Sequence, residues 1–126
     1  MTLDKIHARA EGPTQGLTRQ PLEGRARNGG LRIGEMEKDA IVAHGTSQFL
    51  KEKFLECSDI YKTYVCNTCG MLATKVPEKD YWICMNDDCN ENPNISSIVL
   101  PYSCKLLFQE LMSVNIKPMI KAKSDI

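Results

Sequence analysis

The chain has 126 residues, equal numbers of basic and acidic side chains, and a formal net charge of zero at pH 7. This length suffices for one domain with a modest core, and the zero net charge excludes a global basic field, so any binding to nucleic acid must come from a local patch. No apolar run is long enough to cross a bilayer, and the charged N-terminus lacks the pattern of a signal peptide. We therefore expect an intracellular protein with no membrane partner.

Residue types are unevenly distributed along the chain. Seven of the eight glycines precede residue 46, whereas all eight aromatic residues and all six cysteines follow residue 48. The first third therefore cannot build a hydrophobic core by itself, and we expect it to form short strands that join a larger sheet. It also contains a loop rich in arginine and glycine at residues 18–37, TRQPLEGRARNGGLRIGEME.

Two consecutive helices are predicted after this loop, at about residues 35–44 and 46–57. Small and apolar residues recur there every three or four positions, and Glu35 lies in the first turn, where the helix dipole favours acids. Gly45 and the capable N-cap Thr46 predict the break between the two helices.

A third helix is predicted after Pro101, a residue that suits the first turn, and Pro118 is expected to mark its end. Its apolar stripe repeats at helical spacing and is expected to pack in a core or subunit contact. The stripe consists of Cys104, Leu107, Phe108, Leu111 and Val114.

Four cysteines between these helices have the spacing of a zinc site. CNTCG supplies Cys66 and Cys69, and after a gap of 14 residues CMNDDC supplies Cys84 and Cys89. Two thiolate pairs joined by a hairpin can surround a tetrahedral zinc ion. Strands are predicted around them at residues 61–65, 71–76, 81–85 and 95–100, which gives a zinc ribbon over residues 62–99. Four thiolates close the coordination sphere, so we expect this zinc to be structural and not catalytic.

Details around the cysteines refine this prediction. Gly70 follows the second ligand and is expected to have a positive φ. Asp87 and Asp88 lie between the ligands of the second pair and are expected to be solvated, because four thiolates leave no open position. Cys57 and Cys104 lie on apolar helix stripes, and we interpret them as buried thiols.

The order of these motifs resembles the C-terminal end of the second-largest subunit of multisubunit DNA-directed RNA polymerases. The resemblance covers about residues 4–118 and rests on the four cysteines and on two strings, DKIHARAEGPTQGLTRQPLEGRARNGGLRIGEMEKDAIVAHG and PYSCKLLFQELMSVNIKP. The bacterial β subunit shares the glycine-rich core but lacks the zinc ribbon, so the eukaryotic, archaeal or large-DNA-virus type is indicated. A full subunit is many times longer, so the chain is either a fragment or a naturally split subunit.

The resemblance implies an α+β fold with two parts. Residues 1–45 are expected to form the C-terminal part of a hybrid-binding domain with a switch-like loop, and residues 46–126 a clamp-anchoring region with the zinc ribbon and the C-terminal helix. In this family the loop touches the template strand near the RNA–DNA hybrid, and glycines and arginines suit contact with phosphates. The implied nucleic-acid contacts are Lys5, Arg19, Arg25, Arg27 and Arg32.

The implied partners are template DNA, the RNA–DNA hybrid, the largest polymerase subunit and the remainder of the second-largest subunit. The implied activity is nucleotidyl transfer by the assembled polymerase during transcription. The magnesium-binding aspartates of this family belong to the largest subunit, and neither His7 nor His44 has a nucleophile at a recognisable spacing, so no catalytic residue is predicted here. The implied localisation is the nucleus for a eukaryotic protein, and a viral factory, virion or cytoplasm for a viral or archaeal one.

Two other functions fit parts of the pattern. A free-standing zinc-ribbon transcription factor would bind through the ribbon, which offers few basic residues (Lys62, Lys75 and Lys79) and no aromatic array for stacking on single strands. A purely structural assembly module would touch no nucleic acid. Reversing the charge of the loop separates this last function from the polymerase hypothesis, because an assembly module would tolerate it.

Overall fold

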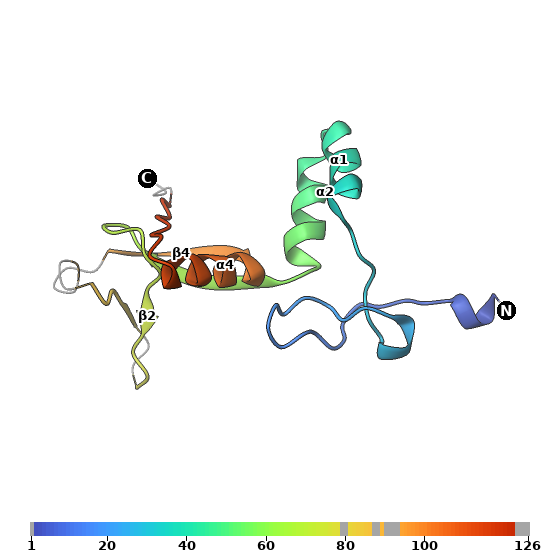
Figure 1. Ribbon diagram of the computed structural model, residues 1–126, viewed down its shortest axis with the longest axis horizontal. Coiled ribbons are helices and arrows are strands. Elements are labelled where there is room, and N and C mark those ends of the chain that lie inside the picture. The colour runs from blue at the N-terminus through green and yellow to red at the C-terminus, as the bar shows by residue number, and fades with distance from the viewer. Residues whose placement is uncertain (1, 79–80, 87–88, 90–93, 123–126) are drawn as a thin grey trace. The chain divides into compact units, whose positions relative to one another are not determined.

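The computed structural model describes residues 2–78, 81–86, 89 and 94–122. These residues form α-helices, short 3-10 and π-helical turns, and two small two-stranded sheets (Figure 1). This content confirms the α+β class. The chain divides into two compact units. The first comprises Met1–Ile60 with Pro101–Ser103, and the second comprises Tyr61–Leu100 with Cys104–Ile126.

The first third of the chain contains the 3-10 turns η1 (Leu3–Lys5) and η2 (Arg25–Arg27). Its extended segments pair through isolated bridges, Thr14 with Pro21 and Glu23 with Gly30. Gly29 is the one buried residue between positions 2 and 34. This stretch thus contributes no apolar side chain to a core, as its composition indicated.

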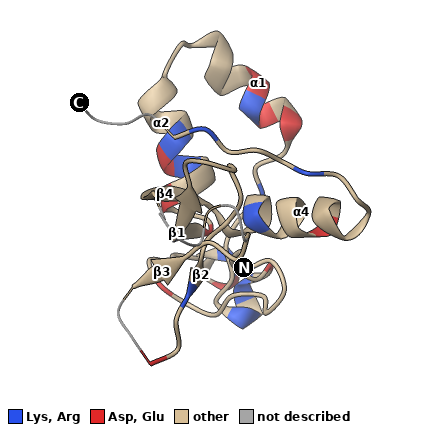
Figure 2. Ribbon diagram, turned by 90° about the vertical axis from the view of Figure 1, so that its left-hand side faces the viewer, with Lys and Arg blue, Asp and Glu red and all other residues tan. Residues whose placement is uncertain are grey.

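Helices α1 (Glu35–Ala43) and α2 (Ser47–Lys51) confirm the predicted pair. Acidic residues occupy the first turn of α1 (Figure 2), where the Glu37 carboxylate accepts a hydrogen bond from the Gly34 N–H at 2.9 Å. This bond satisfies one of the N–H groups that a helix start leaves unpaired. Helix α2 runs on into a π-helical turn, η3 (Glu52–Glu56), which the periodicity did not predict.

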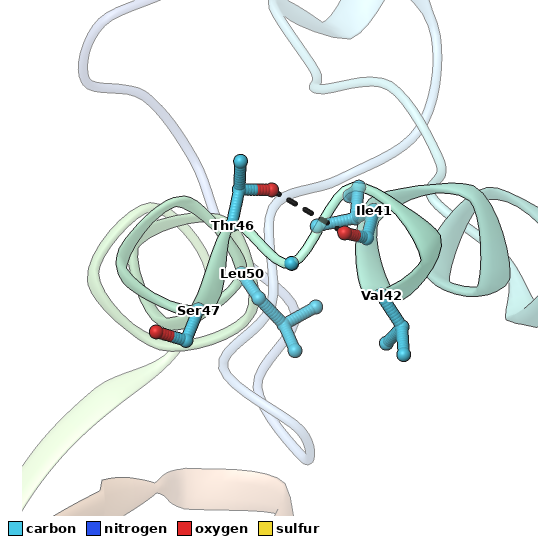
Figure 3. Close-up of a pocket in the computed structure, with 6 residues that line it drawn as sticks. Ile41, Val42, Thr46, Ser47 and Leu50 are labelled. Carbon is cyan, nitrogen blue, oxygen red and sulfur yellow. Dashed lines mark hydrogen bonds between the residues drawn. The ribbon is translucent and has the colours of Figure 1, made fainter.

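The break between α1 and α2 lies at Gly45, whose φ of 70° is a left-handed conformation that favours glycine. Thr46 precedes α2 but does not cap it with its side chain. Its hydroxyl donates to the Ile41 carbonyl at 3.3 Å and so closes the turn (Figure 3). Val42 and Leu50 line a small apolar pocket beside this turn.

The second unit contains the four predicted strands. Strand β1 (Ile60–Cys66) pairs with β4 (Ile95–Pro101), and β2 (Thr74–Lys75) pairs antiparallel with β3 (Trp82–Ile83). A bridge between Val65 and Leu72 continues β1 into a hairpin. The buried hydrophobic residues of the described chain all lie here, and four of them are the predicted cysteine ligands. The set is Val65, Cys66, Cys69, Ala73, Cys84, Cys89 and Leu100.

The third predicted helix is α4 (Tyr102–Ser113), which ends five residues before Pro118. Asn115 has a φ of 66°, and the Ile116 N–H donates to the Leu111 carbonyl at 3.0 Å, so a left-handed C-terminal turn stops the helix before the proline can. On the expected stripe Cys104, Phe108 and Leu111 are half-buried, whereas Leu107 and Val114 are exposed. Among the described residues no helix combines the length and apolar character needed to cross a membrane.

Candidate metal centre and nucleic-acid interface

Four thiols meet in the core of the second unit. Cys66 ends strand β1, Cys69 follows in the next turn, and Cys84 comes directly after β3. With Cys89 they are at most 7% exposed, and their sulfur atoms all lie within 4.8 Å of one another. Zinc–sulfur bonds of about 2.3 Å place the four sulfurs of a tetrahedral site about 3.8 Å apart. The Cys69 and Cys84 sulfurs are 3.4 Å apart, so the donor set and its spacing fit such an ion.

The first cysteine pair lies in a tight turn stabilised by backbone hydrogen bonds. The Gly70 N–H donates to the Cys66 carbonyl at 2.8 Å, and the Cys66 N–H donates to the Met71 carbonyl at 2.9 Å. Gly70 has a φ of 74°, which confirms the expectation for this position. Its carbonyl accepts from the Ile120 N–H at 2.9 Å, so the segment after α4 packs on this turn.

Burial affects the thiols unequally. It raises the pKa of Cys66, but the backbone N–H groups of Cys69 and Thr68 donate to the Cys66 sulfur and lower its pKa to about 6. Burial, with the neighbouring thiols of Cys66 and Cys69, raises the pKa of Cys89 to about 12. Burial also raises the pKa of Cys84. The cluster thus accommodates one thiolate readily, and further negative charge requires a cation among the sulfurs.

The surroundings of the cluster are apolar. Met71 and Ile95 pack against the four cysteines. Asp87, Asp88 and Lys79 lie outside the described residues.

Cys104 is half-buried, but Cys57 is exposed, so the expectation of a buried Cys57 thiol is wrong. Cys57 lies just beyond the π-helical turn. Such a turn contains one residue more than an α-helical turn, so Cys57 no longer lies on the apolar stripe that a regular helix would have.

The five predicted nucleic-acid contacts are exposed but do not have the same surroundings. Arg25 donates from Nε to the Ile6 carbonyl at 2.7 Å and from Nη2 to the Leu3 carbonyl at 3.2 Å. The Arg19 guanidinium lies 4.0 Å from the centre of the Tyr102 ring. Within the described part of the chain, the side chains of Lys5, Arg27 and Arg32 make no hydrogen bond or ion pair.

Two residues that sequence reasoning did not select also shape the loop. Arg9 Nη1 donates to the carbonyls of Asn28 at 2.7 Å and Pro13 at 3.0 Å. His7 Nε2 hydrogen-bonds the Gly29 carbonyl at 2.5 Å. The string DKIHARA contained both residues, but contacts to backbone carbonyls leave no spacing pattern that would reveal them.

Comparisons with known proteins place these features in one family of proteins. Residues 29–123 match the family model described as RNA polymerase Rpb2, domain 7, and residues 1–27 match RNA polymerase Rpb2, domain 6. The chain is 57% identical over its whole length to DNA-directed RNA polymerase subunit 2 of Acanthamoeba polyphaga mimivirus.

Eukaryotic proteins show comparable similarity. Over 96% of the chain, the identity to DNA-directed RNA polymerase II subunit RPB2 of Schizosaccharomyces pombe is 52%. Over 98% of the chain, the identity to DNA-directed RNA polymerase II subunit 2 of Arabidopsis thaliana is 50%. In each of these three matches the chain spans about 10% of the relative's length.

Proposed function

This chain belongs to the family of second subunits of DNA-directed RNA polymerases, and on that premise we propose that its arginine- and glycine-rich loop contacts template DNA and the RNA–DNA hybrid. The contacts proposed are those of Lys5, Arg19, Arg25, Arg27 and Arg32 with phosphate oxygens. Residues 1–45 complete the hybrid-binding domain, and residues 46–126 anchor the clamp to the largest subunit.

The nucleic-acid proposal rests on the exposure of the Arg27 and Arg32 guanidinium groups and on their lack of ion pairs within the described residues. Both guanidinium groups are exposed, and neither forms an ion pair with a carboxylate in the described residues. Unpaired guanidinium groups keep their full charge and five donors, which match phosphate oxygens in geometry. Such contacts neutralise phosphates without reading bases, as a polymerase that transcribes any template requires.

The ligands proposed for one structural zinc ion are Cys66, Cys69, Cys84 and Cys89. The ion would hold the two hairpin turns of the ribbon together, and four thiolates leave no position for a reactive water. We assign no catalytic residue to this chain. Nucleotidyl transfer, with the magnesium ions it needs, is proposed for the assembled polymerase, in which another subunit supplies the magnesium ligands. The proposed location is the nucleus for a eukaryotic protein and a viral factory, virion or cytoplasm otherwise.

The test removes the two unpaired charges from an assembled polymerase that contains this chain. Replacing Arg27 and Arg32 with Ala should weaken retention of the elongation complex to the same extent on unrelated templates. Each lost phosphate contact should flatten the dependence of log affinity on log salt by about 0.7 to 0.9. Lys38→Ala is the matched control, because it removes one exposed charge from α1, outside the loop. An unchanged salt dependence in the double variant would refute the contact.

The alternatives have less support. In the ribbon, Tyr64 and Trp82 stack on each other with ring centroids 4.5 Å apart, so one face of each ring is covered and is not available to a base. This disfavours a free-standing zinc-ribbon factor that binds single strands. A purely structural module would leave the exposed charges of Arg27 and Arg32 without a role.

A further inference from the structure

The arginines of the first unit differ in what their guanidinium groups bind. Arg25 reaches from the loop to the carbonyls of Leu3 and Ile6, and Arg9 reaches back from the N-terminal segment to the carbonyls of Pro13 and Asn28. The two side chains thus join the same two segments in opposite directions. The hydrogen bond between His7 and the Gly29 carbonyl lies between the same segments.

The loop that these bonds hold has an unusual backbone. Gly24 has a φ of 105° and Asn28 a φ of 50°, and the Gly29 N–H closes the turn on the Gly24 carbonyl at 2.9 Å. This turn contributes no apolar side chain to a core, so hydrophobic burial cannot hold its shape. Hydrogen bonds therefore hold the turn, and those from charged donors are stronger than the neutral backbone bonds beside them.

We propose that Arg9 and Arg25 are positioning residues, which hold the turn at residues 24–30 in a fixed shape so that Arg27 and Arg32 meet the nucleic-acid backbone. The acceptors of both positioning residues are neutral backbone carbonyls, and each guanidinium makes two hydrogen bonds to them within the first unit. This inference rests on the proposed nucleic-acid contact. It keeps Lys5, Arg19, Arg27 and Arg32 as phosphate contacts and moves Arg25 from that set to a positioning role.

A glutamine substitution at Arg25 separates its charge from its donor. The Nε2 atom of a glutamine lies the same number of bonds from the backbone as the Nε atom of an arginine. Arg25→Gln therefore retains a donor for the Ile6 carbonyl and loses the positive charge and the bond to the Leu3 carbonyl, whereas Arg25→Ala loses all three. Arg27→Gln is the matched variant, because it loses charge at an exposed side chain that holds no internal acceptor.

The experiment uses the assembled polymerase and two readouts. Hydrogen exchange of the amides of residues 24–30, measured by mass spectrometry without nucleic acid, reports the shape of the turn. Arg25→Ala and Arg9→Ala should speed this exchange about ten-fold or more, since each removes hydrogen bonds from a charged donor, and Arg25→Gln, which keeps a donor for the Ile6 carbonyl, should speed it less than Arg25→Ala does. Arg27→Gln should leave exchange unchanged. The second readout is retention of the elongation complex as a function of salt concentration. The slope of log affinity against log salt should equal that of the parent for Arg25→Gln and should be flatter by about 0.7 to 0.9 for Arg27→Gln.

Two results would overturn the positioning role alone. One is unchanged exchange in both alanine variants. The other is an Arg25→Gln variant whose salt slope falls as far as that of Arg27→Gln, which would make Arg25 a phosphate contact. If Arg27→Gln and Arg32→Gln leave the slope unchanged while Arg25→Ala still speeds exchange, the nucleic-acid contact fails, the positioning role is overturned with it, and Arg25 is left with a structural role in the turn.

Discussion

The carboxylate of Asp59 caps helix α4 by binding Ser103. Its Oδ2 atom accepts hydrogen bonds from the Ser103 backbone N–H at 2.9 Å and from the Ser103 hydroxyl at 2.7 Å. The Asp59 backbone carbonyl accepts a third, from the Tyr102 N–H, at 2.8 Å. A residue 44 positions earlier in the chain thus satisfies two N–H groups that the helix start leaves unpaired, and places negative charge where the helix dipole favours it.

Removing this cap should destabilise the fold. Asp59 is 4% exposed, and Asp59→Ala leaves the half-buried Ser103 donors without this acceptor, so it should lower the free energy of unfolding by about 1 to 3 kcal/mol. Asp59→Asn keeps an acceptor oxygen and should lose less. Denaturant unfolding of the zinc-loaded chain measures both. Asp39→Ala is the control: this exposed acid pairs with Lys38 at 3.1 Å, and the change should stay within about 0.5 kcal/mol. Equal losses in the Asp59→Ala and Asp39→Ala variants would contradict the capping role.

The zinc site makes a prediction about stoichiometry. The reduced chain should bind one zinc ion, and Cys84→Ala should abolish tight binding, because three thiolates leave the tetrahedral site open. Cys57→Ala should bind zinc as the parent does, since Cys57 is exposed and lies outside the cluster. Elemental analysis of the purified chains gives the metal content directly. A Cys57→Ala variant without zinc, or a parent chain that binds none, would show the assignment to be wrong.

Zinc binding should also release protons. At pH 7 the Cys66 thiol, with its pKa of about 6, is largely ionised, whereas raised pKa values keep Cys84 and Cys89 protonated. Zinc binds thiolates, so each bound ion should release at least two protons, and affinity should rise with pH through the neutral range and fall on acidification. Titration calorimetry in two buffers of different ionisation enthalpy counts the released protons. Release of fewer than two at pH 7 is the result that this prediction excludes.

Gly29 should tolerate no side chain. A Cβ atom at this position would lie 2.2 Å from the Leu22 carbonyl oxygen, a backbone atom that cannot move away without opening the bridge between Glu23 and Gly30. Gly29→Ala should therefore open the turn and speed hydrogen exchange at the Gly30 amide, which donates to Leu22 at 2.7 Å.

The matched control for this prediction is Gly16→Ala. Apart from Gly16 and its two neighbours in the chain, no heavy atom of the described residues lies within 4 Å of the Cβ position at Gly16, so the same chemical change is made in open space. Exchange at Gly30 should keep its parent rate in this variant. Similar exchange rates in the Gly29→Ala and Gly16→Ala variants would show that the close approach to Leu22 does not constrain the loop.

Features that depend on neighbouring residues could be predicted from the sequence. The two cysteine pairs, the break at Gly45 and the strands of the ribbon all follow from short spacings, because a turn or a metal knuckle needs particular residues at fixed offsets. The family was recognisable for the same reason, since its motifs are contiguous strings. The early end of α4 and the π-helical turn were not predicted, because small local energies decide them.

Only the tertiary structure decided which side chains act inside the loop and which remain exposed. Arg9 and Arg25 are charged residues in a polar stretch, as Arg27 and Arg32 are, and nothing in their local sequence distinguishes them. Arg9 reaches a carbonyl 19 positions away in the sequence, and Arg25 reaches carbonyls 19 and 22 positions away. The Asp59 cap on Ser103 joins residues 44 positions apart. Every residue carries a carbonyl, so an acceptor of this kind leaves no mark on the sequence, and the path of the folded chain alone determines which one a given arginine reaches.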